Sequence, residues 1–161
     1  MLDLTSNRIK YHEFQERFKK YLTKGCLIYD IGRSDIHDYK ETFKDYKYIT
    51  IDRLKSKNPD LVEDFEGSVF LDQADAVILN GVTEQCDNPF KIFHNIHLIL
   101  KKGGVALFGI ISVGCPLYTW DYLRFTPNGV KHLLKDYKIL EEEIVYRGDM
   151  PDYIFKIVQK I

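Results

Sequence analysis

The chain has 161 residues, of which 45% are hydrophobic and 29% are charged, and its formal net charge at pH 7 is −1. This length fits one domain with a single core, and the composition is not that of a disordered or fibrous chain. The near-neutral charge gives no electrostatic reason to expect a nucleic acid or an anionic membrane as the partner. The start of the chain lacks the features of a signal peptide, and its longest apolar run, residues 105–113, is well short of the roughly 20 residues that span a bilayer. We therefore expect a cytoplasmic protein.

The N-terminal part of the chain predicts one helix followed by strands. Residues 7–24 place large apolar side chains at helical spacing, and Gly25 is the expected stop. Two apolar runs rich in β-branched residues, 26–31 and 46–52, then predict the first two strands. We expect the helix to pack beside the sheet that these strands begin.

The connection between the first two strands and the segment after them contain weaker signals. A capping-box pattern at residues 38–41 predicts a short helix that buries Tyr39 and Phe43. Residues 59–67 predict a short third strand. Residues 74–80 form a continuous apolar run, which is typical of a strand buried on both faces of a parallel sheet.

Two further helices are predicted in the C-terminal half. A capping residue followed by proline begins each of them, at residues 88–89 and 126–127. The first has an equally strong stop at residues 101–104, where two lysines precede two glycines, and the second extends its apolar face to Tyr137.

Three more strands complete the predicted elements, at residues 105–113, 138–146 and 153–161. Only six residues, 147–152, separate the last two, which is too short for a parallel crossover, so these strands should pair antiparallel. The alternation predicts an α/β fold: a Rossmann-like three-layer sandwich whose seven-stranded sheet is mostly parallel and ends in an antiparallel hairpin.

Acidic residues follow the first two strands at the edge of the sheet where ligands usually bind. Asp30 and Gly32 end the first strand, and Asp52 ends the second, about twenty residues beyond the glycine. This spacing is typical of an acid that hydrogen-bonds ribose hydroxyls. Both acids could instead be capping or turn residues, but their joint placement favours nucleotide recognition.

Five local strings follow one another along the chain: residues 28–32 (IYDIG), 48–52 (YITID), 64–65 (DF), 82–89 (VTEQCDNP) and 121–127 (DYLRFTP). In this order and spacing they resemble the class I S-adenosylmethionine-dependent methyltransferases. The resemblance runs from about Leu27 to the C-terminus. The resemblance implies a single domain over residues 1–161, with an N-terminal helix in residues 1–25 and a cofactor-binding core in residues 26–161.

The resemblance also implies S-adenosylmethionine as the cofactor. The residues it assigns to cofactor binding are Asp30, Gly32, Arg33, Asp52, Arg53, Asp64, Phe65 and Asn80. The loop after the first strand keeps only one of the two or three glycines that the family usually has there. We hypothesise that Arg33 partly compensates by pairing with the methionine carboxylate of the cofactor, which a guanidinium can hold through two parallel hydrogen bonds.

Methyl transfer needs mainly proximity and alignment, and a base only when the acceptor must lose a proton. If a base exists, Asp121 and Glu84 are the candidates, although Glu84 is more easily interpreted as a solvated loop acid. Tyr118, Trp120 and Tyr122 follow the fifth strand together with Asp121 and would form the acceptor wall, or else fill the core.

Other reactive residue types form no convincing site. His94 and His97 lie three residues apart on a predicted helix without a third ligand, so we predict no metal site. The three cysteines are widely spaced, which suggests neither a disulfide framework nor a zinc site.

The sequence therefore predicts an S-adenosylmethionine-dependent methyltransferase acting on a small molecule or sugar. The alternative is a non-catalytic, methyltransferase-like binding or scaffold protein, because the glycine loop is reduced. A nicotinamide-dependent oxidoreductase is disfavoured because the full GxGxxG pattern is absent. The free edge of the sheet or the aromatic first helix could serve a homodimer.

Overall fold

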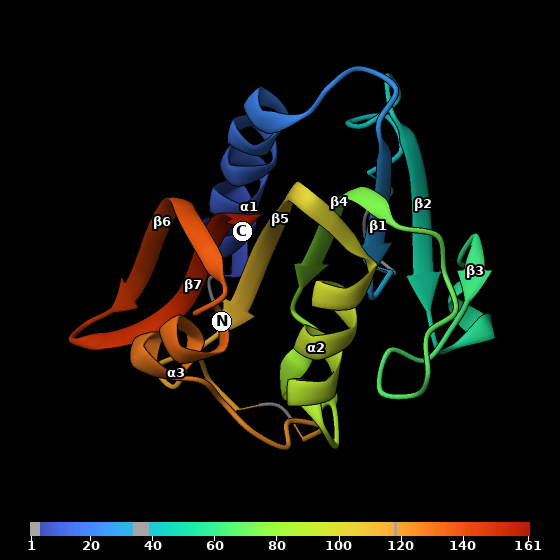
Figure 1. Cartoon of the computed structure of the whole chain (residues 1–161). Helices are drawn as coiled ribbons and strands as arrows, with labels where there is room; N and C mark the ends of the chain where they lie inside the picture. The colour runs from blue at the N-terminus through green and yellow to red at the C-terminus, as the bar shows by residue number, and fades with distance from the viewer. Residues whose placement is uncertain (1–3, 34–38, 118) are drawn as a thin grey trace.

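A computed structural model describes residues 4–33, 39–117 and 119–161 of the chain. Its seven strands form one sheet in the order β3-β2-β1-β4-β5-β7-β6 (Figure 1). The strands are β1 (Leu27–Ile31), β2 (Lys47–Asp52), β3 (Leu61–Val62), β4 (Ala74–Asn80), β5 (Leu100–Ile111), β6 (Tyr137–Arg147) and β7 (Met150–Lys160). The helices are α1 (Leu4–Phe18), α2 (Pro89–Ile99) and α3 (Pro127–Leu133), with single 3₁₀ turns η1 (Lys19–Tyr21), η2 (Lys55–Lys57) and η3 (Thr83–Gln85).

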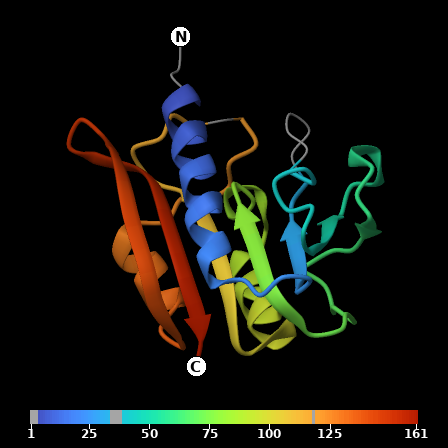
Figure 2. The same ribbon diagram turned by 90° about the horizontal axis from the view of Figure 1, so that it is seen from above.

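The predicted fold class is confirmed. Strands β3, β2, β1, β4 and β5 pair in parallel, whereas β7 runs antiparallel to both β5 and β6. Helix α1 covers one face of the sheet, and α2 and α3 cover the other (Figures 1 and 2). The chain therefore has three layers, as the alternation of elements predicts.

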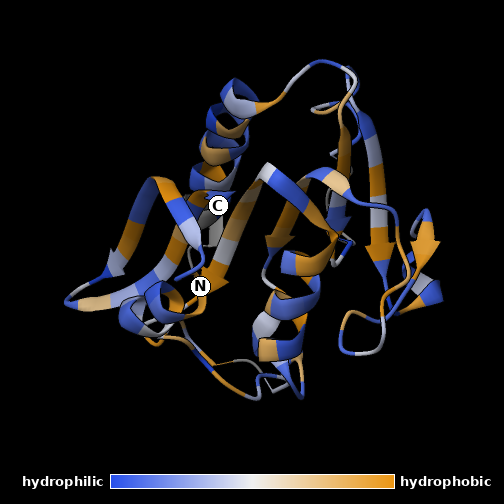
Figure 3. Cartoon of the chain, viewed as in Figure 1, coloured by the Kyte–Doolittle hydropathy of each residue, from blue (hydrophilic) through white to orange (hydrophobic). Residues whose placement is uncertain are grey.

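Each face of the sheet has its own core because side chains alternate along a strand. On the α2 side, Tyr29 and Ile31 of β1 pack with the apolar stripe of α2. On the α1 side, Ile28 packs with Phe14 and Phe18, and the Phe14 ring stacks on that of Phe155 at 5.1 Å. Figure 3 shows hydrophobic residues along the central strands, whereas polar residues recur along β6 at the sheet edge.

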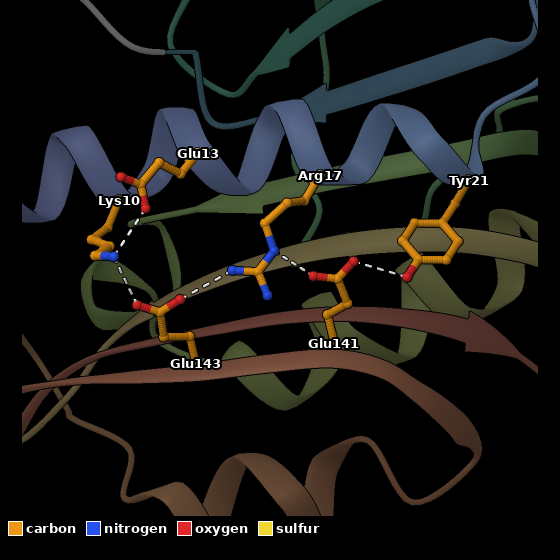
Figure 4. Close-up of polar contacts among 6 residues, drawn as sticks. All are labelled: Lys10, Glu13, Arg17, Tyr21, Glu141 and Glu143. Atoms are coloured by element: carbon orange, nitrogen blue, oxygen red, sulfur yellow. Dashed lines mark hydrogen bonds and ion pairs between the residues drawn. The ribbon is translucent and has the colours of Figure 1, made fainter.

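The aromatic face of the first helix is not available for a dimer. The rings of Tyr11, Phe14 and Phe18 are buried against β7 and its neighbours within the same chain. A network of polar contacts on the outer side also joins α1 to β6 (Figure 4). In it, Arg17 donates to Glu141 and to Glu143, the latter at 3.0 Å.

Two of the predicted helices differ from the structure. Residues 40–45 form turns instead of a helix, although Tyr39 and Phe43 are buried as expected, and Asp38 of the predicted capping box lies outside the described residues. Helix α3 ends at Leu133, so Tyr137 belongs to β6.

The glycine pair expected to end the second long helix lies inside β5 instead. Gly103 has a φ of 76°, and the pairing of β5 with β4 shifts register between Ala74 and Ala76. The chain therefore passes from α2 into an irregular first part of β5 without a separate loop. Among the described residues, no helix is both long and apolar enough to cross a membrane.

Candidate functional site

A cavity of about 520 Å³ opens at the carboxyl ends of β1, β2 and β4. Its size is typical of small-molecule sites, which occupy roughly 300 to 1,000 Å³. Seven of the eight predicted cofactor-binding residues line this cavity, namely Gly32, Arg33, Asp52, Arg53, Asp64, Phe65 and Asn80. The strand ends of a parallel sheet bring them together, because these ends meet at one edge.

Gly32 makes the tight turn that leaves β1. Its φ is 85°, which side-chain-bearing residues rarely adopt, and a Cβ added there would collide with Cγ2 of Val82. Its N–H donates to the carbonyl of Ile51 at 2.8 Å, which holds the turn against β2. The one glycine of this loop is therefore fixed by both conformation and space, and the backbone forms one wall of the cavity.

The acids after β2 and β3 line the neighbouring part of the cavity. Asp52 is buried, and its Oδ1 accepts a hydrogen bond from the backbone of Leu54 at 2.8 Å. Asp64 is exposed, Phe65 is buried beside it, and Arg53 forms an ion pair with Glu66 at 3.3 Å. These residues provide carboxylate acceptors next to an apolar ring, a combination that suits a nucleoside.

Arg33 and Asn80 lie on opposite sides of the Gly32 turn. The guanidinium of Arg33 donates to the carbonyl of Asn58, in the loop before β3. The Oδ1 of Asn80 accepts a hydrogen bond from the hydroxyl of Tyr153 at 2.8 Å. Asn80 pairs with Gly109 across β4 and β5, and a Cβ on Gly109 would collide with the Asn80 amide.

Asp30 is the predicted cofactor residue that does not line the cavity. It shares a strand face with Ile28, under α1, and its carboxylate accepts a hydrogen bond from the hydroxyl of Tyr48. Burial raises the pKa of Asp30 to about 7, and the Tyr48 hydrogen bond opposes this shift. Asp30 and Ile31 point to opposite faces of the sheet because side chains alternate along a strand.

The other end of the cavity is lined by aromatic side chains that the sequence did not assign to a site. They come from α1, from the turns after β1, and from β7: Tyr11, Tyr39 and Tyr153. Arg8 of α1 and Cys115 also line this end, together with Trp120, which was predicted to do so. No local motif marks Tyr11 or Tyr153, since aromatic residues at helical or strand spacing are typical of core positions.

The segment between β5 and α3 is held by buried polar contacts. Arg124 donates to the carboxylate of Asp121 and to the carbonyl of Pro116 at 3.1 Å, and its contact to the carbonyl of Ser112 is 3.4 Å. The side chains of Asp121 and Arg124 are only 2% and 7% exposed. Asp121 and Tyr122 do not line the cavity, and Tyr118 lies outside the described residues.

Glu84 is buried, which corrects its interpretation as a solvated loop acid. It is 1% exposed, and burial raises its pKa to about 7. Its Oε1 lies 3.6 Å from where a Cβ on Gly81 would stand, directly behind the cavity wall. Neither carboxyl oxygen has a hydrogen-bond partner of ordinary geometry among the described residues.

The described part of the chain offers no side-chain cluster for metal ligation. No group of three or more His, Cys, Asp or Glu side chains that could hold an ion occurs within residues 4–33, 39–117 and 119–161. The three cysteines are free thiols; Cys86 and Cys115 are buried, and Cys26 is half-buried.

Comparison with known proteins agrees with this geometry. Residues 34–108 match the family model described as a methyltransferase domain. This match confirms the predicted resemblance to the class I S-adenosylmethionine-dependent methyltransferases. A search of curated proteins gives no match.

Solved structures share the fold over most of the chain. The N-methyltransferase NodS from Bradyrhizobium japonicum WM9 superposes with a TM-score of 0.75 at 12% identity, over 99% of both chains. TehB from Haemophilus influenzae gives 0.74 at 15% identity, over 93% of this chain and 62% of TehB. A 1,6-didemethyltoxoflavin-N1-methyltransferase from Burkholderia thailandensis, solved with 1,6-didemethyltoxoflavin and S-adenosylhomocysteine, gives 0.70 at 13% identity, over 91% and 76%. At these identities the likeness shows the fold alone.

Proposed function

We propose that this protein is an S-adenosylmethionine-dependent methyltransferase that acts on a small molecule or sugar. The observation that carries the proposal is the cavity at the strand ends, where the Gly32 turn, Asp52 and the Asp64–Phe65 pair meet. Residues from three separate strand ends converge there in the order that the family's motifs have along the chain. We further propose that residues 1–161 act as one domain, with residues 1–25 as a helix on the core 26–161.

The cavity residues fit the proposed cofactor in their chemistry. Asp52 would accept hydrogen bonds from ribose hydroxyls, since its position is fixed by the Leu54 N–H. Asp64 and Phe65 would face the adenine, and Arg53 would lie beside them. Gly32 and Asn80 would border the methionine part of the cofactor. Asp30 does not line the cavity, so it would affect the cofactor only indirectly, by positioning the residues that do.

When bound, the cofactor would supply a methyl group activated by a sulfonium, so the protein's own task is to bind, orient and exclude water. Of the two acids proposed as a base, Asp121 is engaged with Arg124, whereas Glu84 has a pKa near 7 and lies behind Gly81. We therefore favour Glu84 as the group that takes up a proton when the acceptor must lose one. Pairing of Arg33 with the methionine carboxylate would require it to leave the Asn58 carbonyl.

Calorimetric titration tests the cofactor assignment directly. S-adenosylmethionine and S-adenosylhomocysteine should bind saturably, and NAD should not. Asp52→Asn should weaken both affinities at least about ten-fold, because the amide loses the charge that strengthens hydrogen bonds to ribose.

The matched control for that substitution is Asp75→Asn. Asp75 lies at the opposite end of β4, where it accepts hydrogen bonds from Leu27 and Lys101. It should leave cofactor affinity unchanged. Absence of binding at millimolar cofactor would contradict the proposal and favour the non-catalytic scaffold.

A further inference from the structure

The two ends of the cavity differ in charge. Acidic side chains line the end at β2 and β3, where Asp52, Glu63, Asp64 and Glu66 occur together with basic residues. At the aromatic end, Arg8 is the one charged side chain among the described residues that line the cavity. The aromatic end therefore carries a positive charge that no lining acid of the described chain balances.

Arg8 is placed to act on a bound molecule. It lies three residues before Tyr11 on α1, so both side chains share the helix face that reaches the cavity. Arg8, Tyr11 and Tyr39 all line the cavity. Burial and the charge of Asp30 raise the pKa of Tyr39 to about 12, and the positive charge of Arg8 opposes this shift. Within the described chain, no hydrogen bond or ion pair engages Arg8.

Two buried acids of the described chain, Asp30 and Glu84, do not line the cavity, and burial raises the pKa of each to about 7. Asp30 is also engaged by the Tyr48 hydroxyl. Among the described lining residues, Arg8 thus has no acid beside it at this end, so a cationic acceptor would be repelled and an anionic acceptor attracted.

The aromatic walls are held in place and suit a flat ligand. The rings of Tyr11 and Tyr39 meet edge to face at 5.5 Å between centroids. The Tyr153 ring stacks on Phe155 at 4.7 Å, and its hydroxyl is fixed by Asn80. Aromatic rings fixed in this way favour a planar partner through stacked or edge-to-face contacts.

We propose that the methyl acceptor is a planar aromatic molecule bearing a carboxylate, which lies among Tyr11, Tyr39 and Tyr153 and is bound by Arg8. A guanidinium binds a carboxylate through two parallel hydrogen bonds, so it recognises both the charge and the shape of this group. This inference rests on the proposed methyltransferase function, and it narrows the acceptor from any small molecule or sugar to an aromatic acid.

The position of Arg8 depends on the attachment of α1 to the rest of the chain, which offers a matched control. Arg17 lies on the same helix, away from the cavity, and holds α1 to Glu141 and Glu143 of β6 (Figure 4). Arg17→Gln removes the same charge from the same helix as Arg8→Gln. Any effect that comes only from looser packing of α1 or from lost net charge should appear in both variants.

The test is calorimetry in two stages on the intact protein. S-adenosylhomocysteine is titrated first into the parent, Arg8→Gln and Arg17→Gln. Each saturated protein is then titrated with benzoate, 4-hydroxybenzoate and indole-3-carboxylate, and with the matching neutral carboxamides. In the parent, at least one carboxylate should bind about ten-fold or more tightly than its amide, and Arg8→Gln should remove that preference while Arg17→Gln keeps it.

The outcomes separate this inference from the proposed function. If S-adenosylhomocysteine does not bind the parent, the methyltransferase function is wrong. If it binds but no carboxylate is preferred over its amide, only the acceptor inference is overturned. Loss of S-adenosylhomocysteine affinity in Arg8→Gln would also overturn it, because Arg8 would then serve the cofactor, and an equal loss of preference in Arg17→Gln would assign the effect to α1 packing.

Discussion

The two ends of the cavity are built in different ways. The end at β2 and β3 uses short loops that directly follow strands, so Gly32, Asp52 and Asp64 each lie at or within a few residues of a strand end. The aromatic end combines α1, a turn after β1, the segment after β5 and the last strand, and its residues Arg8 and Tyr153 are far apart in the sequence.

This difference separates what the fold provides from what the individual chain provides. Any sheet with this strand order brings the carboxyl ends of β1, β2 and β4 together. The location of the proposed cofactor end of the cavity is therefore set by the sheet topology. The aromatic end depends on side-chain packing of α1 against β7 and on the buried pair Asp121–Arg124. We therefore expect substitutions at the β2–β3 end to lower cofactor affinity. Substitutions at the aromatic end should change the local structure there and leave cofactor affinity nearly unchanged.

The largest effect is expected from Arg124→Gln, which would break the buried pair and leave the Asp121 carboxylate without its charged partner. Loss of one partner of a buried pair costs about 3 to 5 kcal/mol, and we expect the lower part of this range for the free energy of unfolding in urea. Trp120 is the single tryptophan of the chain and is 55% exposed, so the anisotropy of its emission should fall as this segment loosens.

The double variant Asp121→Asn/Arg124→Gln is the control for that prediction, because it removes both charges and should recover part of the lost stability. Affinity for S-adenosylhomocysteine should stay within about two-fold of the parent, since the segment lies at the other end of the cavity. A cofactor affinity that falls together with the Trp120 signal would contradict the separation of the two ends.

Gly32→Ala should have the next largest effect, and it should act on the cofactor end. The positive φ costs about 1 to 2 kcal/mol, and the collision with Val82 adds about 1 kcal/mol or more. We expect an unfolding free energy lower by about 2 to 3 kcal/mol and loss of measurable S-adenosylhomocysteine binding in calorimetry.

Gly103→Ala is the matched control for Gly32→Ala. Gly103 has a similar φ of 76°, but a Cβ there would meet nothing within 4 Å. It should show only the conformational cost of about 1 to 2 kcal/mol and bind the cofactor normally. The variant Gly32→Ala/Val82→Ala should regain the part of the stability that the collision removes; if it does not, the close approach to Val82 is not what requires glycine.

The smallest effect is expected from Glu84→Gln, and it should depend on pH. Because the folded-state pKa of Glu84 is about 7, above its ordinary 4.5, the folded protein binds more protons than the unfolded chain between these values. Stability should therefore fall as the pH rises through this window and stay level above it. Glu84→Gln should be more stable than the parent by about 1 to 3 kcal/mol near pH 8 and equal to it near pH 4.5.

Urea unfolding at these two pH values measures the effect. Asp30 has a raised pKa in the same range, so Glu84→Gln should reduce the fall in stability and Asp30→Asn/Glu84→Gln should reduce it further. The lowered pKa of His97 acts in the opposite direction in this range and is common to the parent and both variants. A difference in stability between parent and Glu84→Gln that is the same at both pH values would show that Glu84 is not held in its protonated form.

Hydrophobic periodicity and turn residues predicted most of the fold. Strand β4 was predicted correctly because its largely apolar residues, with the uninterrupted run 76–79, are typical of a parallel strand that is covered on both faces. Helix α2 was clear because Asn88 and Pro89 form a strong start. The glycines at 103–104 misled the prediction, because a left-handed glycine is equally compatible with a helix end and with an irregular strand.

The sequence by itself determined the order of strands and helices along the chain, because each element depends on a local pattern. It also determined the loop residues at the proposed cofactor end, because the carboxyl ends of parallel strands meet at one edge of the sheet. Only the tertiary structure decided that Glu84 is buried, that Asp30 does not line the cavity, and that Arg8 and Tyr153 both line it. Burial and long-range contact depend on how separate elements pack, and a residue's neighbours along the chain do not contain that information.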